Sequence, residues 1–290
     1  MPDIKIKGSE IENIVDSLSS IVDKKEYCND NYVSITLKNE CGKGGISIIK
    51  ISEFITSINF DLTFYKDQNI SFNSNSSHHI DFIYCLEGHL KQKLLNQTKL
   101  EPISFRQNSI FGRASKTKNV ITFLGDVHVK ACVVIFKNEN VLRIVNEHKE
   151  VDLRATAVKE LSNSFEQKDF SYLGRICFKP AIYAKELFCS NNVSSPDLLF
   201  AEAAILNIIA SQWEKHIEDS NSEEADAPLR QSELDQIIAV ESFIISNISE
   251  NLSIDRLVNI SGLNPAKLQL GFNYLFNTTI SSYVREKTLR

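Results

Sequence analysis

Residues 251–290 have the sequence NLSIDRLVNISGLNPAKLQLGFNYLFNTTISSYVREKTLR. Ser253 predicts the start of a helix from Ile254 to about Ile260, because a serine hydroxyl can accept a hydrogen bond from a free backbone N–H at a helix N-terminus. Gly262 ends that helix, since glycine enters the left-handed conformation at little cost. The stretch therefore opens with a short helix that has both of its ends marked.

A second helix follows directly. Asn264 and Pro265 start it, the first as the cap and the second as the first helical residue. Its buried face is predicted from apolar side chains at helical spacing, which are Leu268, Phe272, Leu275 and Phe276. Two short helices joined by a turn of about three or four residues that contains glycine predict a helix-turn-helix.

The outward side of the second helix decides whether this motif reads DNA. In a helix-turn-helix the second helix lies in the major groove, so the predicted recognition helix is Asn264–Tyr274. Asn and Gln can pair with adenine, and Lys can donate to guanine or phosphate. The outward positions are Asn264, Ala266, Lys267, Gln269, Leu270 and Asn273. Any helical hairpin can show the same spacing, so spacing alone leaves both interpretations open.

The same residues resemble the first helix-turn-helix of AraC/XylS-type bacterial transcription regulators. The resemblance rests on the Ser-Ile start, a Leu-Val pair, Gly262, the Asn-Pro helix start, Lys267-Leu268-Gln269, Gly271-Phe272, Leu275-Phe276, Thr278-Thr279-Ile280 and Tyr283-Val284-Arg285. Gly271-Phe272 is similar to the subgroup of pyochelin-responsive regulators. Asn277 stands where the family usually has Gly, and Asn264 where Ser is common.

The resemblance implies a cytoplasmic regulator that binds DNA, responds to a small-molecule effector and acts as a homodimer. It adds Arg285 to the expected DNA contacts. Activator is the role expected by analogy, although nothing in the sequence separates it from repressor. Family members continue into a second helix-turn-helix, whereas this sequence stops at Arg290. A truncated modulator that does not bind DNA, and instead pairs with a full-length regulator, is therefore an open alternative.

Residues 45–136 have the texture of an antiparallel sandwich or barrel, which the family's cupin-like sensor domain also implies. Short runs of Ile, Val, Phe and Thr alternate with Asn, Ser, Gly and Lys clusters. The predicted strands are Ile46–Ile51, Phe54–Tyr65, Ile80–Leu86, His89–Leu95, Val120–Leu124 and Val127–Phe136. Glu87-Gly88 is the expected hairpin turn between two of these strands.

Apolar residues at helical spacing predict a short helix within residues 11–22. The same spacing predicts that residues 138–219 are mainly helical. The strongest helix begins at Pro196-Asp197, and its wide apolar stripe predicts either core packing or a dimer seam. Residues 221–231 have the composition of a linker. The expected organisation is therefore an α+β chain, with a sensor and dimerisation domain at 1–220 and a partial helix-turn-helix domain at 232–290.

Composition limits the partners and the compartment. Residues 251–290 contain five Lys or Arg and two Asp or Glu, a charge of +3; because the chain carries −5, residues 1–250 carry −8. An acidic body with a basic end fits a protein that touches DNA at one end. The six cysteines show no metal-ligand spacing. Four of them, Cys85, Cys132, Cys177 and Cys189, lie in apolar stretches and are expected to be reduced thiols in the core. No apolar run suits a membrane span, so the cytoplasm and no membrane contact are expected.

Enzymatic readings have weaker support. His78-His79-Ile80-Asp81 through Gly88 faintly resembles a cupin metal motif, but adjacent strand residues point to opposite faces. A cupin-type metal enzyme stays as the alternative, while no metal, no cofactor and no catalysis are the expectation. Gly42-Lys43-Gly44-Gly45 lacks the Lys-Ser/Thr helix start of a phosphate loop, so it is predicted to be a turn. The ligand-binding residues of the sensor are not identified by any motif.

Overall fold

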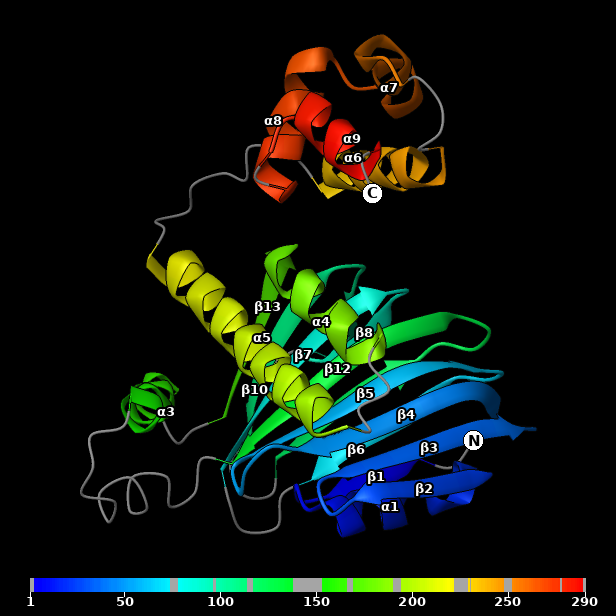
Figure 1. The fold of residues 1–290 in the computed structure, drawn as a ribbon, viewed down its shortest axis with the longest axis vertical. Coiled ribbons are helices and arrows are strands. Elements are labelled where there is room, and N and C mark those ends of the chain that lie inside the picture. Colours follow the sequence, from blue (N-terminus) through cyan, green and yellow to red (C-terminus); the bar gives the residue numbers. More distant parts are fainter. Residues whose placement is uncertain are drawn as a thin grey trace. The chain divides into compact units, whose positions relative to one another are not determined.

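The computed structural model describes residues 3–73, 78–95, 98–113, 117–137, 153–165, 169–189, 194–221, 229, 231–247, 252–276 and 278–288. The chain divides into two compact units, Met1–Asp219 and Ser220–Arg290. The first contains strands and helices and the second contains helices, so the α+β prediction is confirmed (Figure 1).

Two sheets form the body of the first unit. The smaller has the order β1-β6-β11-β8-β9, with β1 parallel to β6 and the other pairs antiparallel. Its strands are β1 (Ile4–Lys7), β6 (Gln68–Asn73), β11 (Lys118–Phe123), β8 (Leu90–Lys93) and β9 (Leu100–Ile103).

The larger sheet is antiparallel throughout and has the order β13-β10-β7-β12-β5-β4-β3-β2. Its strands are β13 (Phe170–Ile176), β10 (Gln107–Arg113), β7 (His79–Glu87), β12 (His128–Lys137), β5 (Ile55–Phe64), β4 (Gly42–Lys50), β3 (Tyr32–Asn39) and β2 (Lys24–Asn29).

The larger sheet is covered on both faces. Its first face packs on the smaller sheet and on α1 (Ile11–Leu18), which continues into η1 (Ser19–Ile21); this core includes Ile14, Phe60, Phe72 and Phe123. Its second face packs beneath helices in a separate core that includes Phe82, Tyr84, Ile205 and Ile208. Central strands with two covered faces read as nearly continuous apolar runs, and β7 is buried along its length up to Leu86.

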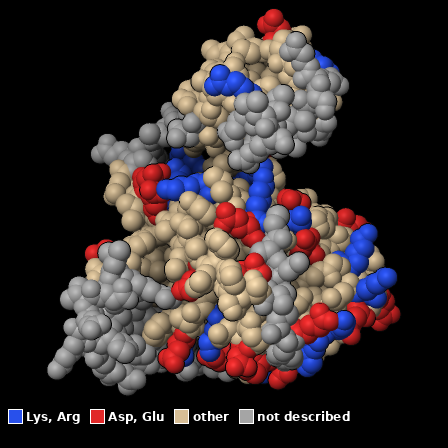
Figure 2. Space-filling view, viewed as in Figure 1, with Lys and Arg blue, Asp and Glu red and all other residues tan. Residues whose placement is uncertain are grey.

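The helices over the second face are α3 (Leu153–Ser164), α4 (Lys179–Cys189) and α5 (Ser195–Asn221). Figure 1 shows α5 lying across the sheet with α4 beside it. Figure 2 shows that the surface over the N-terminal half of α5 is largely uncharged. None of the helices that the structure describes combines the length and apolar character that crossing a bilayer requires.

Two local expectations were wrong. The first was the hairpin expected at Glu87-Gly88. Gly88 has φ +77°, as a tight turn needs, but β7 and β8 belong to different sheets, so the turn takes the chain from one sheet to the other. Gly42–Gly45 lies in strand β4, not in a turn. A Cβ on Gly44 would stand 2.3 Å from the carbonyl oxygen of Asp61, so glycine lets β5 approach closely.

The strands also extend beyond the range predicted for them. β1, β2 and β3 precede residue 45, and β13 lies within residues 138–219, which were expected to be helical. β13 pairs antiparallel with β10 at the edge of the larger sheet, although the local sequence predicted a helix there. Residues 138–152 of the region expected to be helical, and most of the expected linker, lie outside the described residues.

Candidate nucleic-acid interface

The second unit is a set of helices around its own core. They are α6 (Gln231–Ser246), α7 (Ile254–Ser261), α8 (Pro265–Phe276) and α9 (Ile280–Thr288). Buried side chains from all four elements and from the turn fill the centre, among them Ile237, Val240, Leu257, Leu263, Leu268, Phe272 and Tyr283. Helices this short depend on such packing for their stability.

The turn between α7 and α8 is built by local chemistry. The Ser253 hydroxyl accepts a hydrogen bond from the backbone N–H of Arg256. Gly262 has φ +68° and ψ +7°, the left-handed conformation predicted for it, and its N–H donates to the carbonyl of Val258. Leu263 is buried at the corner, and the Asn264 Oδ1 accepts from the Lys267 N–H at 2.8 Å. These bonds set where α8 begins and its direction relative to α7.

Close packing against α6 orients α8 about its own axis. Gly271 faces α6 so closely that a Cβ there would stand 1.8 Å from Cδ1 of Ile237. On the same side, the Lys267 ammonium forms an ion pair with the Glu233 carboxylate. Phe272 makes ring contacts with Phe276 and Tyr283, at centroid distances of 4.9 and 5.7 Å. One side of α8 is thereby fixed to the unit.

The opposite side of α8 is turned outward. Ala266, Leu270 and Asn273 are exposed and Gln269 is partly exposed. At about 100° per residue these four positions share one face, because they are spaced three and four residues apart. The face presents a carboxamide from Gln269, another from Asn273 and an apolar patch from Leu270, which is 45% exposed.

Lys267 stands apart from this face. It lies about 100° around the helix from Ala266, on the side of α6, where Glu233 neutralises it. Its side chain is still 47% exposed, and such exposed ion pairs are worth little and exchange readily. Arg285 on α9 and Arg256 on α7 are exposed as well, and the Arg256 guanidinium lies 5.4 Å from the ring centre of Phe243. Sequence reasoning identified neither the Glu233 contact nor Arg256, because both depend on α6.

A buried bond from α9 to α6 completes the unit. The Tyr283 hydroxyl donates to Oε1 of Glu241 at 2.7 Å, and Glu241 is only 2% exposed. This bond holds the start of α9, and with it Arg285, against the helical core. Tyr283 therefore supports the position of an exposed arginine, although its sequence pattern suggested only a family match.

In the first unit, the carboxylate of the faint cupin motif is already occupied. Asp81 and Arg113 form a two-point ion pair at 2.8 and 3.0 Å, and both side chains are fully buried. The Asn119 amide donates to the same carboxylate at 2.9 Å. A bond from the Gln92 amide to Asn119 extends the network. These partners neutralise Asp81 and engage both oxygens, so it is poorly suited to act as a metal ligand.

The two histidines of the faint cupin motif do not complete a metal site either. His79 is buried at the start of β7, and His78 lies just before that strand. Among the residues that the structure describes, no group of three His, Cys, Asp or Glu side chains could hold a metal ion. Burial raises the pKa of Cys132 to about 12 and that of Cys85 still further, which disfavours the thiolate form of these two side chains.

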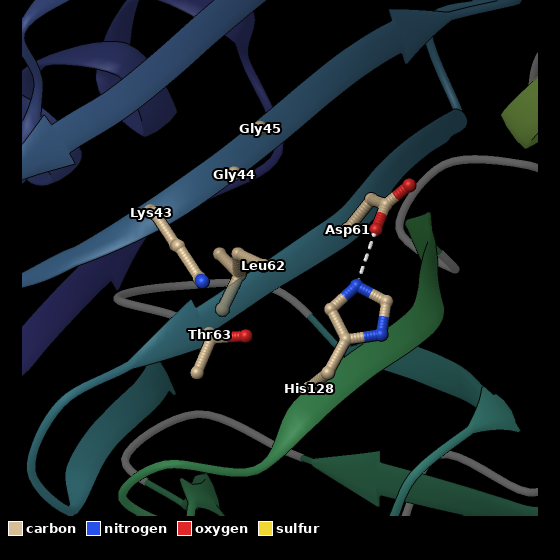
Figure 3. Close-up of a pocket in the computed structure, with 7 residues that line it drawn as sticks. All are labelled: Lys43, Gly44, Gly45, Asp61, Leu62, Thr63 and His128. Carbon is tan, nitrogen blue, oxygen red and sulfur yellow. Dashed lines mark hydrogen bonds and ion pairs between the residues drawn. The ribbon is translucent and has the colours of Figure 1, made fainter.

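An open hollow of about 450 Å³ lies on the first unit (Figure 3). It is lined by Lys43, Gly44, Gly45, Asp61, Leu62, Thr63 and His128. The His128 Nε2 and the Asp61 Oδ1 lie 2.8 Å apart, and the Lys130 ammonium lies 3.5 Å from Glu87 and 3.8 Å from Asp61. Exposed charges such as these are screened by salt.

No protein-family model matches the chain, and no curated protein sequence matches it either. Solved structures similar to it include an apo ToxT variant from Vibrio cholerae, at 15% identity and a TM-score of 0.35, covering 81% of this chain and 98% of that one. ToxT from the same organism with a bound unsaturated fatty acid gives 14% identity and a TM-score of 0.35, covering 81% and 96%. An RmlC-like cupin protein from Desulfovibrio desulfuricans gives 17% identity and 0.24, covering 31% and 77%.

Proposed function

We propose that this chain is a sequence-specific DNA-binding transcription regulator of the AraC/XylS type, in which α8 enters the major groove. The observation that carries the proposal is the outward face of α8, with Gln269, Leu270 and Asn273 side by side on a helix whose other side is fixed. Recognition needs a rigid helix that presents polar and apolar groups to base edges, and this helix has both properties.

The roles of the individual residues follow from groove chemistry. Gln269 and Asn273 are proposed to read adenine through paired hydrogen bonds, and Leu270 to contact a thymine methyl group. Ala266 allows close approach of the helix. Asn264, at the N-terminus of α8, is proposed to lie near the backbone of the DNA, where free N–H groups favour phosphate.

Lys267 and Arg285 are proposed to contact phosphate and not bases. Lys267 points toward α6 and already has an acidic partner, so a phosphate would replace Glu233 as its counter-ion. Arg285 is exposed on α9. Such contacts contribute affinity in every sequence context, and they make binding weaker at high salt.

The partners proposed for the whole chain are DNA, a small-molecule effector taken up by the first unit, and a second copy of the chain. The effector would act by favouring the arrangement in which α8 can bind. The pyochelin-type subgroup and the activator role rest on the sequence resemblance alone. A cupin-type metal enzyme is disfavoured by the ion pair that occupies Asp81. The role of a modulator that does not bind DNA is the competing proposal.

A selection on randomised duplexes, followed by fluorescence polarisation at low and physiological salt, tests the proposal. We expect Gln269→Ala and Asn273→Ala each to relax the preference at one base pair, by about 10- to 100-fold, since a paired contact is worth about 1–3 kcal/mol. Lys267→Ala should weaken all sequences alike and lower the salt slope by about one.

Asn259→Ala is the matched control, because Asn259 is an exposed asparagine on α7 that lies outside the proposed face. It should leave the base preference unchanged. If the chain binds no duplex even at low salt, the regulator proposal fails and the modulator takes its place. That alternative predicts inhibition of a full-length relative on its own operator.

A further inference from the structure

The outer face of the smaller sheet carries a group of lysines. Ile6, Phe72 and Ile121 point from this sheet into the sandwich core, so the residues that alternate with them along the strands point outward. The outward lysines form the basic face, which consists of Lys5 and Lys7 on β1, Lys118 on β11, and Lys91 and Lys93 on β8. Lys91 is partly exposed and the other four are exposed.

Strand pairing brings these lysines close together. Lys7 and Lys118 lie on either side of Asn73, because β1 and β11 both pair with β6. Lys91 lies beside Thr122 on the next strand of the sheet. Neighbouring strands are about 4.8 Å apart, so the basic face spans a width of about 14 Å from β1 to β8.

The lysines of the basic face form no ion pair with an acidic side chain that the structure describes. Elsewhere on the first unit, Lys50, Lys130 and Lys179 each form an ion pair with a carboxylate. Asp3 and Asp67 directly precede β1 and β6, and they accept hydrogen bonds from the Asn69 amide and the Gly125 N–H. Positive charge is therefore gathered on this face, although residues 1–250 carry −8.

Protection against aggregation accounts for only part of this pattern. Lysines on an edge strand discourage pairing with another sheet, which suits Lys5 and Lys7 because β1 is an edge of its sheet. The strands β11 and β8 are interior, yet they carry the other three lysines. Like charges gathered on one face repel one another, so an anionic partner explains these three lysines better.

The surface between the lysines indicates the chemistry of that partner. It consists of amide and hydroxyl side chains and one partly exposed apolar residue, which are Asn69, Ser71, Asn73, Thr122 and Val120. Lysine, asparagine, serine and threonine are among the side chains that contact the phosphates of DNA. Proteins that enter a membrane interface add aromatic or large apolar side chains. The outward positions of these four strands hold none of those, and Leu100 lies beyond them on β9.

We infer that the basic face binds the phosphate backbone of duplex DNA without reading its sequence. A duplex carries about one negative charge per 1.7 Å, so a stretch of about 14 Å offers about eight phosphates to the lysines. Such contacts add affinity in every sequence context and make binding more dependent on salt. The inference goes beyond the proposed function, because it gives the first unit a DNA contact of its own that does not depend on α8.

Fluorescence polarisation of the full chain with a duplex of random sequence, at several salt concentrations, tests the inference. The test variant carries Lys5→Gln, Lys93→Gln and Lys118→Gln together. We expect it to lower the salt slope of the association constant by about two to three, since each phosphate contact contributes about 0.9. Its dissociation constant at low salt should rise at least about tenfold. All three side chains are exposed, so circular dichroism should show an unchanged fold.

A second triple variant, with Lys38→Gln, Lys43→Gln and Lys159→Gln, is the matched control. It removes the same charge from exposed positions on β3, β4 and α3, outside the basic face. Its salt slope should stay near the wild-type value. The comparison therefore separates contact at the basic face from a general loss of positive charge.

Binding to vesicles that contain phosphatidylserine is measured in parallel, because an anionic membrane also presents phosphate. The inference is overturned if the wild-type chain binds no random duplex at low salt, or if the two triple variants have the same salt slope. It is also overturned if the variant of the basic face loses vesicle binding while its DNA binding is unchanged.

These outcomes are distinguishable from those of the α8 experiment. A chain that binds random duplexes through the basic face but shows no base preference would sink the proposed function and leave this inference. A base preference that depends on Gln269 and Asn273, with equal salt slopes in the two triple variants, would do the reverse.

Discussion

At the scale of single residues, the buried pair of Asp81 and Arg113 constrains the first unit. Both side chains are fully buried, and the guanidinium meets the carboxylate through two hydrogen bonds. Removing water from two charges is expensive, so the pair adds little net stability while making each partner dependent on the other. The network with Asn119 and Gln92 ties β7, β10, β11 and β8 together.

We expect Arg113→Met to lower the free energy of unfolding of the first unit by about 3–5 kcal/mol, because it leaves a buried carboxylate without its cation. The double variant Asp81→Asn, Arg113→Met should lose less than half of that amount, since the remaining amide still accepts from Asn119. Urea denaturation followed by the fluorescence of Trp213, the chain's one tryptophan, measures both. Equal losses in the single and double variants would contradict this account.

At the scale of elements, the α7–α8 corner depends on one backbone conformation. Gly262 has φ +68°, and no heavy atom stands within 4 Å of the place a Cβ would occupy. A substitution there meets no steric contact, so its cost is the strain of the left-handed conformation alone. A substitution at Gly262 therefore measures the cost of backbone strain without a change in packing.

We expect Gly262→Ala to destabilise the second unit by about 1–2 kcal/mol, the cost of the left-handed conformation for an ordinary residue. Gly262→Asn should cost less, because asparagine tolerates this conformation better. Hydrogen exchange of amides in α7 and α8 measures the effect. The transition reported by Trp213 in the first unit should not move, and a shift of that transition would show that the two units do not unfold independently.

At the scale of the whole molecule, stability depends on three separate cores and on pH. The first unit buries a sandwich core and a helix-side core, and the second has its own. His216 on α5 packs at the helix-side core, with ring contacts to Phe165 and Tyr172. Burial lowers the pKa of His216 below its ordinary value of 6.5, and the nearby Asp219 opposes that shift in part.

The sign of the pH effect follows from that shift. Below pH 6.5 the unfolded chain binds a proton at His216 that the folded chain takes up only at lower pH, so stability falls as the pH falls through this range. We expect the urea midpoint of the first unit to decrease from pH 7 to pH 5 less steeply in His216→Gln than in the wild-type chain. Parallel curves for the two proteins would refute a contribution from this histidine.

The sequence by itself determined those features whose causes are local. Ser253, Gly262 and Asn264 specify helix ends through bonds within a few residues, and the structure has the cap, the left-handed glycine and the second helix as predicted. The long helix starting near Pro196 was equally clear, since apolar spacing over several turns admits few alternatives. The strands from Phe54 to Tyr65 and from Val127 to Phe136 were predicted from short runs of Ile, Val, Phe and Thr, and the structure has β5 and β12 there.

Only the tertiary structure decided the features that join distant residues. β13 is a strand because β10 offers it an edge, Gly88 passes the chain from one sheet to the other, and Asp81 is committed to Arg113, 32 residues away. Lys267 points toward α6 because Gly271 packs on Ile237. Helix ends are fixed by bonds between near neighbours, whereas sheet order and buried charge pairs are fixed by which surfaces come together, and local sequence carries no direct record of that choice.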